Sequence, residues 1–270
     1  MEKIKIVLSD SFVLFREGIH FVISGEENLD VVGETNDNSN LFDNLITNPA
    51  DIVVIGITED WQKDLNIICR IKRNMPSVSV ILVLNEVKIY QIITAIACDI
   101  SAYLTRESSE INLIDVITQI TIGKLPIIND MLVPDIASEI INNFIWIDKL
   151  SNDIKVYLSD ISSRETEILT EISSGKDIHQ VAEKMNSGEE DIRNELESIR
   201  KKLVANYISK LLIENVQGDL IVNDLPVEEQ TSKEQEHPSV EYITKKEFSE
   251  FKESLKKVID NCLNILKDFS

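Results

Sequence analysis

Residues 161–203 have the sequence ISSRETEILTEISSGKDIHQVAEKMNSGEEDIRNELESIRKKL, which divides into three helical segments that each follow a start signal. Ser162 and Glu165 form a capping box, in which each side chain satisfies a backbone N–H of the other residue. Asp177 is a suitable N-cap for the second segment. The third segment repeats apolar residues at spacings of four, three and four, and so buries one face: Ile192, Leu196, Ile199 and Leu203. Two short helices and a longer third one predict a helix-turn-helix unit.

The same residues resemble the LuxR-type DNA-binding domain at the C-terminus of NarL/FixJ-family response regulators. Residues 164–169 match that family's R-E-x-E-V-L run, 181–183 match I-A-E and 192–194 match V-K-N. A three-helix bundle of any other function would show similar apolar spacing. The resemblance implies that the third helix reads the major groove and that a fourth helix follows at Val204–Glu214. We expect the outer face of the third helix to carry the DNA-binding residues: Glu190, Arg193, Asn194, Glu197, Lys201 and Lys202.

The charge balance limits the strength of any DNA contact. The chain has a formal net charge of −20, and residues 161–203 contain ten acidic and seven basic residues. Nucleic-acid affinity comes largely from neutralising phosphates with Lys and Arg. We therefore expect DNA binding to be weak or to depend on a dimer.

Length and composition indicate a cytoplasmic protein with about two domains. The chain has 270 residues, 43% of them hydrophobic. No apolar run reaches the roughly 18 residues of a membrane span, and the N-terminus reads as a charged strand, so we expect no signal peptide and no membrane partner. The three cysteines and three histidines are scattered, which favours reduced thiols and predicts neither a metal site nor a cofactor.

Residues 1–125 alternate short apolar runs with segments of helix length, the pattern of a parallel sheet wrapped by helices. Five strands are predicted: Ile4–Leu8, Asp30–Gly33, Ile52–Ile55, Val80–Leu84 and Ala102–Leu104. The runs IKIVLSDSFVLFREGI, LDVVGE and ISAYL resemble a receiver domain, which implies a flavodoxin-like fold. Receivers accept a phosphoryl group on an aspartate after the third strand, with the help of a divalent cation.

The positions that carry this chemistry in receivers are altered here. The acceptor position falls on Gly56, which has no carboxylate. Asp10 keeps one acid of the cation-binding pair, but Ser11 replaces the other. The hydroxyl position falls on Leu84 or Asn85, Arg106 replaces the lysine, and Tyr103 keeps the aromatic residue of the fifth strand. We therefore predict a pseudo-receiver that is folded but does not act as a phosphorylation switch.

Four acidic residues, Asp10, Asp51, Glu59 and Asp60, could form a weak cation site. Surface acids in so acidic a chain are more often simply solvated.

The remaining segments suggest five parts in all. These are a pseudo-receiver domain (1–125), a linker helix and connection (126–157), a LuxR-type domain (158–214), a flexible polar linker (215–243) and a C-terminal amphipathic helix (244–270). The last helix repeats apolar residues at alternating spacings of three and four, typical of a coiled-coil seam that would join two copies: Phe248, Phe251, Leu255, Val258, Cys262 and Ile265. Alternatively, this helix does not join two copies but folds back and packs on a domain of its own chain.

Together these features predict an atypical response-regulator-like transcriptional regulator that binds DNA, is a homodimer, and works without aspartyl phosphorylation. The alternative is a protein-interaction module whose acidic helix-turn-helix has lost strong DNA binding and which binds another regulatory protein. We expect no enzymatic activity, because the sequence shows no nucleophile–base pair, Gly-rich phosphate loop or metal-ligand cluster.

Overall fold

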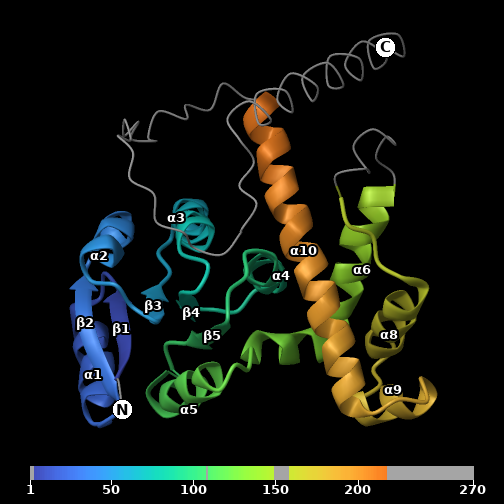
Figure 1. The fold of residues 1–270 in the computed structure, drawn as a ribbon, viewed down its shortest axis with the longest axis horizontal. Helices are drawn as coiled ribbons and strands as arrows, with labels where there is room; N and C mark the ends of the chain where they lie inside the picture. The colour runs from blue at the N-terminus through green and yellow to red at the C-terminus, as the bar shows by residue number, and fades with distance from the viewer. Residues whose placement is uncertain (1–2, 108, 149–157, 218–270) are drawn as a thin grey trace, which may run out of the picture.

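The computed structural model describes residues 3–107, 109–148 and 158–217 (Figure 1). Its N-terminal part is a five-stranded sheet with the order β2-β1-β3-β4-β5, and every neighbouring pair is parallel. The strands are β1 (Ile4–Ser9), β2 (Leu29–Thr35), β3 (Ile52–Gly56), β4 (Ser79–Leu84) and β5 (Ala102–Thr105). This order confirms the flavodoxin-like fold expected from the alternating pattern.

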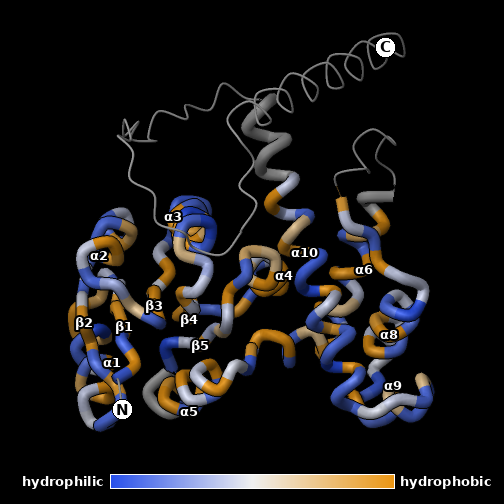
Figure 2. The backbone as a smooth tube through the Cα atoms, in the orientation of Figure 1, coloured by the Kyte–Doolittle hydropathy of each residue, from blue (hydrophilic) through white to orange (hydrophobic). Residues whose placement is uncertain are grey.

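Helices cover both faces of the sheet, which explains why the central strands are apolar along their whole length. Every residue of β3 is buried. One face packs on α1 (Val13–Ser24) and α5 (Ser109–Thr121). The other face packs on α2 (Leu41–Thr47), α3 (Trp61–Asn74) and α4 (Ile89–Ala97). Figure 2 shows hydrophobic residues along the central strands of the sheet, between these two layers of helices.

The C-terminal part is helical and shares its hydrophobic core with the α2–α4 face of the first domain. It contains α6 (Pro134–Asp148), α8 (Ser163–Ser173), α9 (Ile178–Lys184) and α10 (Glu189–Gln217). The 3₁₀-helix η2 (Pro126–Leu132) joins α5 to α6, and a shorter one, η1 (Asn38–Asn40), precedes α2. The predicted capping box of Ser162 and Glu165 is present before α8. Asp177 is the N-cap of α9, as predicted, and it also forms a capping box with Gln180, which is not among the predictions from the sequence.

The expected fourth helix at Val204–Glu214 is not a separate element. Instead, α10 continues without a break from Glu189 to Gln217. Residues 189–217 contain neither Gly nor Pro, so nothing in the sequence ends the helix after Leu203. The helix also enters the first residues of the segment expected to be a polar linker from residue 215. Residues 218–270, with the predicted association helix, lie outside the described part of the chain.

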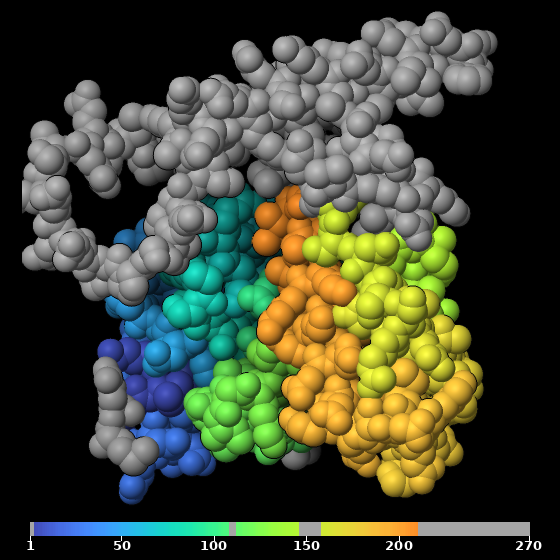
Figure 3. Space-filling model, turned by 45° about the vertical axis from the view of Figure 1, so that its right-hand side comes forward, coloured from blue at the N-terminus to red at the C-terminus, as the bar shows by residue number. Residues whose placement is uncertain are grey.

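α10 lies between the two halves of the molecule (Figure 1). It packs against α4 of the first domain and against α8 and α9 of the second. In the space-filling view α10 separates the receiver-like part from α8 and α9 (Figure 3). Among the described helices, none combines the length and the apolar character that a bilayer crossing requires.

Candidate functional site: the receiver centre and the recognition helix

Three residues of the altered receiver centre meet at the carboxyl ends of β1, β3 and β5. Asp10 is 3% exposed, and its carboxylate lies 2.9 Å from Nη1 of Arg106. The other carboxylate oxygen accepts a 2.7 Å hydrogen bond from the backbone N–H of Phe12. The acid that could have bound a cation is therefore paired with a guanidinium.

Gly56 is necessary for this pairing. A Cβ atom added at position 56 would lie 1.8 Å from Oδ2 of Asp10 and 3.1 Å from Nη2 of Arg106. The first distance is far below any real contact, so a side chain at position 56 would displace the Asp10 carboxylate. The Gly56 carbonyl accepts a 3.0 Å hydrogen bond from Asn38.

Arg106 is fixed on several sides. Its Nε donates to Oδ1 of Asn85 at 2.6 Å. Its guanidinium carbon lies 4.5 Å from the ring centroid of Phe12 and 4.6 Å from that of Phe15, within the range of cation–π attraction. The planar guanidinium therefore supplies a fixed positive charge beside Asp10, where a receiver would hold a lysine and a metal ion.

Among the other predicted receiver positions, Asn85 contacts this pair through its hydrogen bond with Arg106. Leu84 is buried at the end of β4, and Ser11 is exposed after β1. Tyr103 faces the linker, where its hydroxyl donates a 2.8 Å hydrogen bond to Asp130 of η2. Burial and the neighbouring Asp130 carboxylate both raise the pKa of Tyr103. Tyr103 thus connects the sheet to η2.

The suggested four-acid cation site is wrong. Asp51 precedes β3 and accepts a 2.8 Å hydrogen bond from the backbone N–H of Lys5. It therefore lies at the amino-terminal end of the parallel strands, whereas Asp10 lies at their carboxyl end. Asp60 caps α3 by accepting from the backbone N–H of Lys63. Within the described ranges, no group of three or more His, Cys, Asp or Glu side chains is placed to hold a metal ion.

Sequence reasoning missed a buried polar network below the centre. Asn38 donates to Asp64 at 2.8 Å, and Ser9 donates to Asn38 at 2.5 Å. Asp64 also accepts from the backbone N–H and the hydroxyl of Thr58. The network holds the loop after β3. No local pattern in the sequence distinguishes Asn38 or Asp64 from surface residues.

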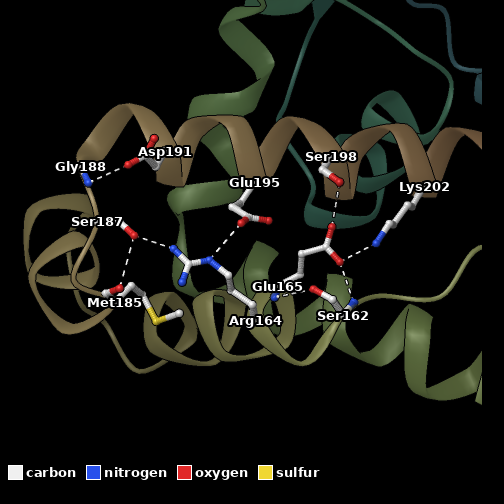
Figure 4. Close-up of polar contacts among 10 residues, drawn as sticks. All are labelled: Ser162, Arg164, Glu165, Met185, Ser187, Gly188, Asp191, Glu195, Ser198 and Lys202. Carbon is white, nitrogen blue, oxygen red and sulfur yellow. Dashed lines mark hydrogen bonds and ion pairs between the residues drawn. The ribbon is translucent and has the colours of Figure 1, made fainter.

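A second buried carboxylate ties α8 to α10 (Figure 4). Glu165 is 2% exposed and accepts hydrogen bonds from Ser198 at 2.8 Å and from Lys202 at 2.5 Å. Burial alone would raise the pKa of Glu165, but the hydrogen bonds from Lys202, Ser162 and Ser198 outweigh it and the pKa is lowered. Arg164 adds a second connection, 3.0 Å from Glu195 of α10.

The six predicted DNA-binding residues divide into two groups. Glu190, Asn194 and Lys201 are exposed on α10, and Lys201 lies 3.6 Å from the Glu197 carboxylate at the surface. The other three form hydrogen bonds with protein groups: Arg193 donates to Asn129 of η2 at 2.8 Å, Glu197 binds Arg200, and Lys202 binds Glu165. Three of the six residues predicted to contact DNA therefore have side-chain hydrogen-bond partners within the protein.

Arg200 joins α10 to the first domain. Its side chain is 7% exposed and forms an ion pair with Asp99, the residue after Cys98 at the end of α4. Its Nε and Nη2 also donate to the Glu197 carboxylate at 2.7 and 2.8 Å. Lys72 of α3 lies 3.0 Å from Asp99 on the other side. The face of α10 that carries Arg193, Glu197 and Arg200 is thus turned toward η2 and α4.

Comparisons with known proteins find regulators with similar sequences. No protein-family model matches the sequence. The chain is 24% identical over 217 residues to the transcriptional regulatory protein LnrK of Bacillus subtilis (strain 168), a match that spans 79% of this chain and 96% of LnrK. It is 19% identical over 218 residues to the response regulator protein VraR of Staphylococcus epidermidis, spanning 81% of this chain and 99% of VraR. The solved structure of the Salmonella typhimurium RcsB response regulator matches 78% of this chain and 99% of its own, at 20% identity and a TM-score of 0.44.

The matches to the curated relatives span nearly their whole length. Residues 3–107 and 109–121 of this chain form a parallel β2-β1-β3-β4-β5 sheet with its five helices, and residues 158–217 form a helix-turn-helix unit. Over the matched length the chain is similar in sequence to a transcriptional regulatory protein and to a response regulator.

Proposed function

We propose that this protein is a DNA-binding transcriptional regulator whose receiver-like domain works without aspartyl phosphorylation. The observation that carries the proposal is the Asp10–Arg106 ion pair beside the bare backbone of Gly56. Aspartyl phosphorylation needs a carboxylate nucleophile and a cation that neutralises the phosphoryl charge. Position 56 has no nucleophile, and a guanidinium already compensates the Asp10 carboxylate.

Incubation with acetyl phosphate and Mg²⁺ tests this part of the proposal. We expect the intact mass to stay unchanged. An added phosphoryl group that maps to residues 1–125 would refute it. An Asp10→Asn variant treated in parallel shows whether any added group sits on that carboxylate.

Two observations support the DNA-binding part of the proposal: the helix α10 and the sequence similarity to a transcriptional regulatory protein and a response regulator. In the arrangement described above, Arg193 and Glu197 face η2 and α4, so α10 must separate from them before this face can enter a major groove. Glu189, Glu190 and Asp191 favour the helix dipole but repel phosphate. Binding should therefore be weak and should fall steeply with salt.

A gel-shift titration with genomic fragments recovered from the tagged protein measures this binding. Arg193→Ala should abolish sequence-specific retention. Lys124→Ala, which removes the same charge from an exposed site on the other domain, should leave it nearly unchanged. The proposal fails if wild type shows no specific binding at low salt.

The second candidate function is a protein-interaction module, and one observation favours it. Arg193, Arg200 and Lys202 all have protein partners, and this removes positive charge from the surface that would meet DNA. In that case the protein would act by binding another regulatory protein. Absence of specific DNA binding, together with a stoichiometric co-purifying protein, would establish this candidate.

We also propose that the protein acts in the cytoplasm as a homodimer and has no catalytic activity. A regulator of transcription must reach the chromosome, and two copies would supply two half-sites. The association element proposed for the dimer is the C-terminal helix.

A further inference from the structure

Two cysteines that the proposed function does not use lie side by side under α10. Cys69 lies within α3 and is partly exposed, whereas Cys98 caps the C-terminus of α4 and is buried. Their sulfur atoms are 3.1 Å apart, about 1 Å more than the length of a disulfide bond. A movement of either side chain by about 1 Å would bring the two sulfur atoms to disulfide-bonding distance.

The two thiols have different surroundings. The hydrogen-bonding contact with the Cys98 thiol lowers the pKa of Cys69. Arg73 and the Tyr207 hydroxyl also lower it, whereas burial raises it. The same thiol contact and burial raise the pKa of Cys98. Cys69 is also the thiol that solvent reaches, whereas Cys98 is buried, so we expect Cys69 to react first. These are the two features of a thiol that reacts with oxidants.

We propose that Cys69 and Cys98 form a peroxide-responsive thiol pair that closes to a disulfide between α3 and α4. The Cys69 thiolate attacks one oxygen of hydrogen peroxide and breaks the O–O bond, which leaves a sulfenic acid on Cys69 and releases hydroxide that is protonated to water. Cys98 then loses its proton, and its sulfur displaces the hydroxyl group of the sulfenic acid as a second water. The two thiols together lose two electrons and two protons, and the peroxide gains them.

The position of the pair connects it to the domain contact. Tyr207 of α10 packs against the hydrophobic cluster that contains Cys98, and its hydroxyl lowers the pKa of both thiols. Asp99, directly after Cys98, pairs with Lys72 and Arg200. A disulfide here would cross-link the two receiver helices at the point where α10 is held. The alternative is that both cysteines are small apolar residues whose contact has no chemical role.

The test uses the full chain with Cys262→Ser, which removes the third cysteine from a segment outside the described residues. After brief exposure to a slight excess of hydrogen peroxide, the intact mass should fall by two hydrogens, both thiols should become unreactive to maleimide under denaturing conditions, and digestion should yield a Cys69–Cys98 linked peptide. Dithiothreitol should reverse the change. Thiols that stay reactive, or that gain oxygen without forming the linked peptide, would overturn the proposal.

Dimedone trapping tests the order of the steps. In Cys262→Ser/Cys98→Ser the sulfenic acid has no partner, so we expect a dimedone adduct on Cys69. In Cys262→Ser/Cys69→Ser we expect at least tenfold less adduct on Cys98. A far-ultraviolet circular dichroism spectrum identifies any variant that has failed to fold, and the disulfide measurement above needs neither core substitution.

Discussion

The guanidinium of Arg106 lies 2.9 Å from the carboxylate of Asp10, in space that stays open because residue 56 is glycine. The two changes depend on each other. An aspartate at position 56 would collide with Asp10 in its present position, and removal of Arg106 would leave Asp10 buried without its ionic partner. Glycine at the acceptor position 56 and arginine at position 106 therefore depend on each other. We expect that neither Gly56→Asp alone nor Arg106→Lys alone would create a phosphorylation site.

Gly56→Ala tests this dependence. The added methyl would lie 1.8 Å from Oδ2 and 2.4 Å from Cγ of Asp10, so the ion pair must move, and we expect the free energy of unfolding to fall by about 1–3 kcal/mol. Urea denaturation measures it. The control is Gly18→Ala in α1, where an added Cβ meets nothing within 4 Å and where replacing a helical glycine should stabilise by about 0.5–1 kcal/mol. Equal effects of the two substitutions would contradict the interpretation.

The sequence predicts elements better than it predicts contacts between them. The apolar runs around Val53 and Leu82, the capping box at Ser162 and the N-cap at Asp177 are local signals, and the structure has the strands and helices that these signals predict. Alignment with the receiver pattern also located Gly56 and Arg106. It did not predict that Arg106 turns back to Asp10, because the partner of a long flexible side chain depends on packing between distant segments.

Two larger features also differ from what the sequence predicts, each for its own reason. The Arg200–Asp99 ion pair joins residues about a hundred positions apart, and it forms only because α10 packs on α4. The family resemblance implies two helices in residues 189–217, but this stretch contains no Gly or Pro to end a helix, and α10 is unbroken.

Acid should weaken the helix-turn-helix unit through Glu165. Its pKa in the folded state is below the ordinary value of 4.5, so folding favours the ionised carboxylate. The resulting stability is fully present above the ordinary pKa and is lost as the pH falls through the folded pKa. Lys202→Met removes a hydrogen bond that lowers this pKa, so the loss should begin at higher pH than in wild type.

Thermal unfolding of the full chain between pH 3 and 7 measures this shift. Lys201→Met is the control, because Lys201 is exposed and lies 3.6 Å from the carboxylate of Glu197 rather than near Glu165. If both lysine variants give the same dependence on pH, Lys202 has no special role in the ionisation of Glu165.

The proposed C-terminal association helix is tested by deletion of residues 243–270. If the repeat from Phe248 to Ile265 forms a seam between two copies, the deletion should lower the mass measured by light scattering from dimer to monomer. Leu255→Asp together with Val258→Asp should do the same, whereas Lys256→Asp, outside the seam, should not. A deletion variant that remains dimeric would place the dimer contact elsewhere or show that the helix folds back on its own chain.

Asp99→Asn tests whether the contact between α4 and α10 limits DNA binding. Asp99 has a positive φ of 60°, a conformation that Asn adopts readily, so the substitution removes the charge and preserves the backbone. Arg200 and Lys72 then lose an ionic partner, and the arrangement in which α10 packs on α4 becomes less favourable. Because only separated α10 can present Arg193 to DNA, we expect specific affinity to rise about three- to tenfold, which corresponds to ~0.7–1.4 kcal/mol.

The control for this measurement is Asp115→Asn on the exposed surface of α5. It removes the same negative charge and so reproduces any general reduction in repulsion of DNA. Fluorescence anisotropy with one labelled operator, at one fixed salt concentration, compares the two variants with wild type. If Asp115→Asn raises the affinity as much as Asp99→Asn does, net charge explains the gain. If only Asp99→Asn does so, release of α10 from Asp99 controls access to DNA.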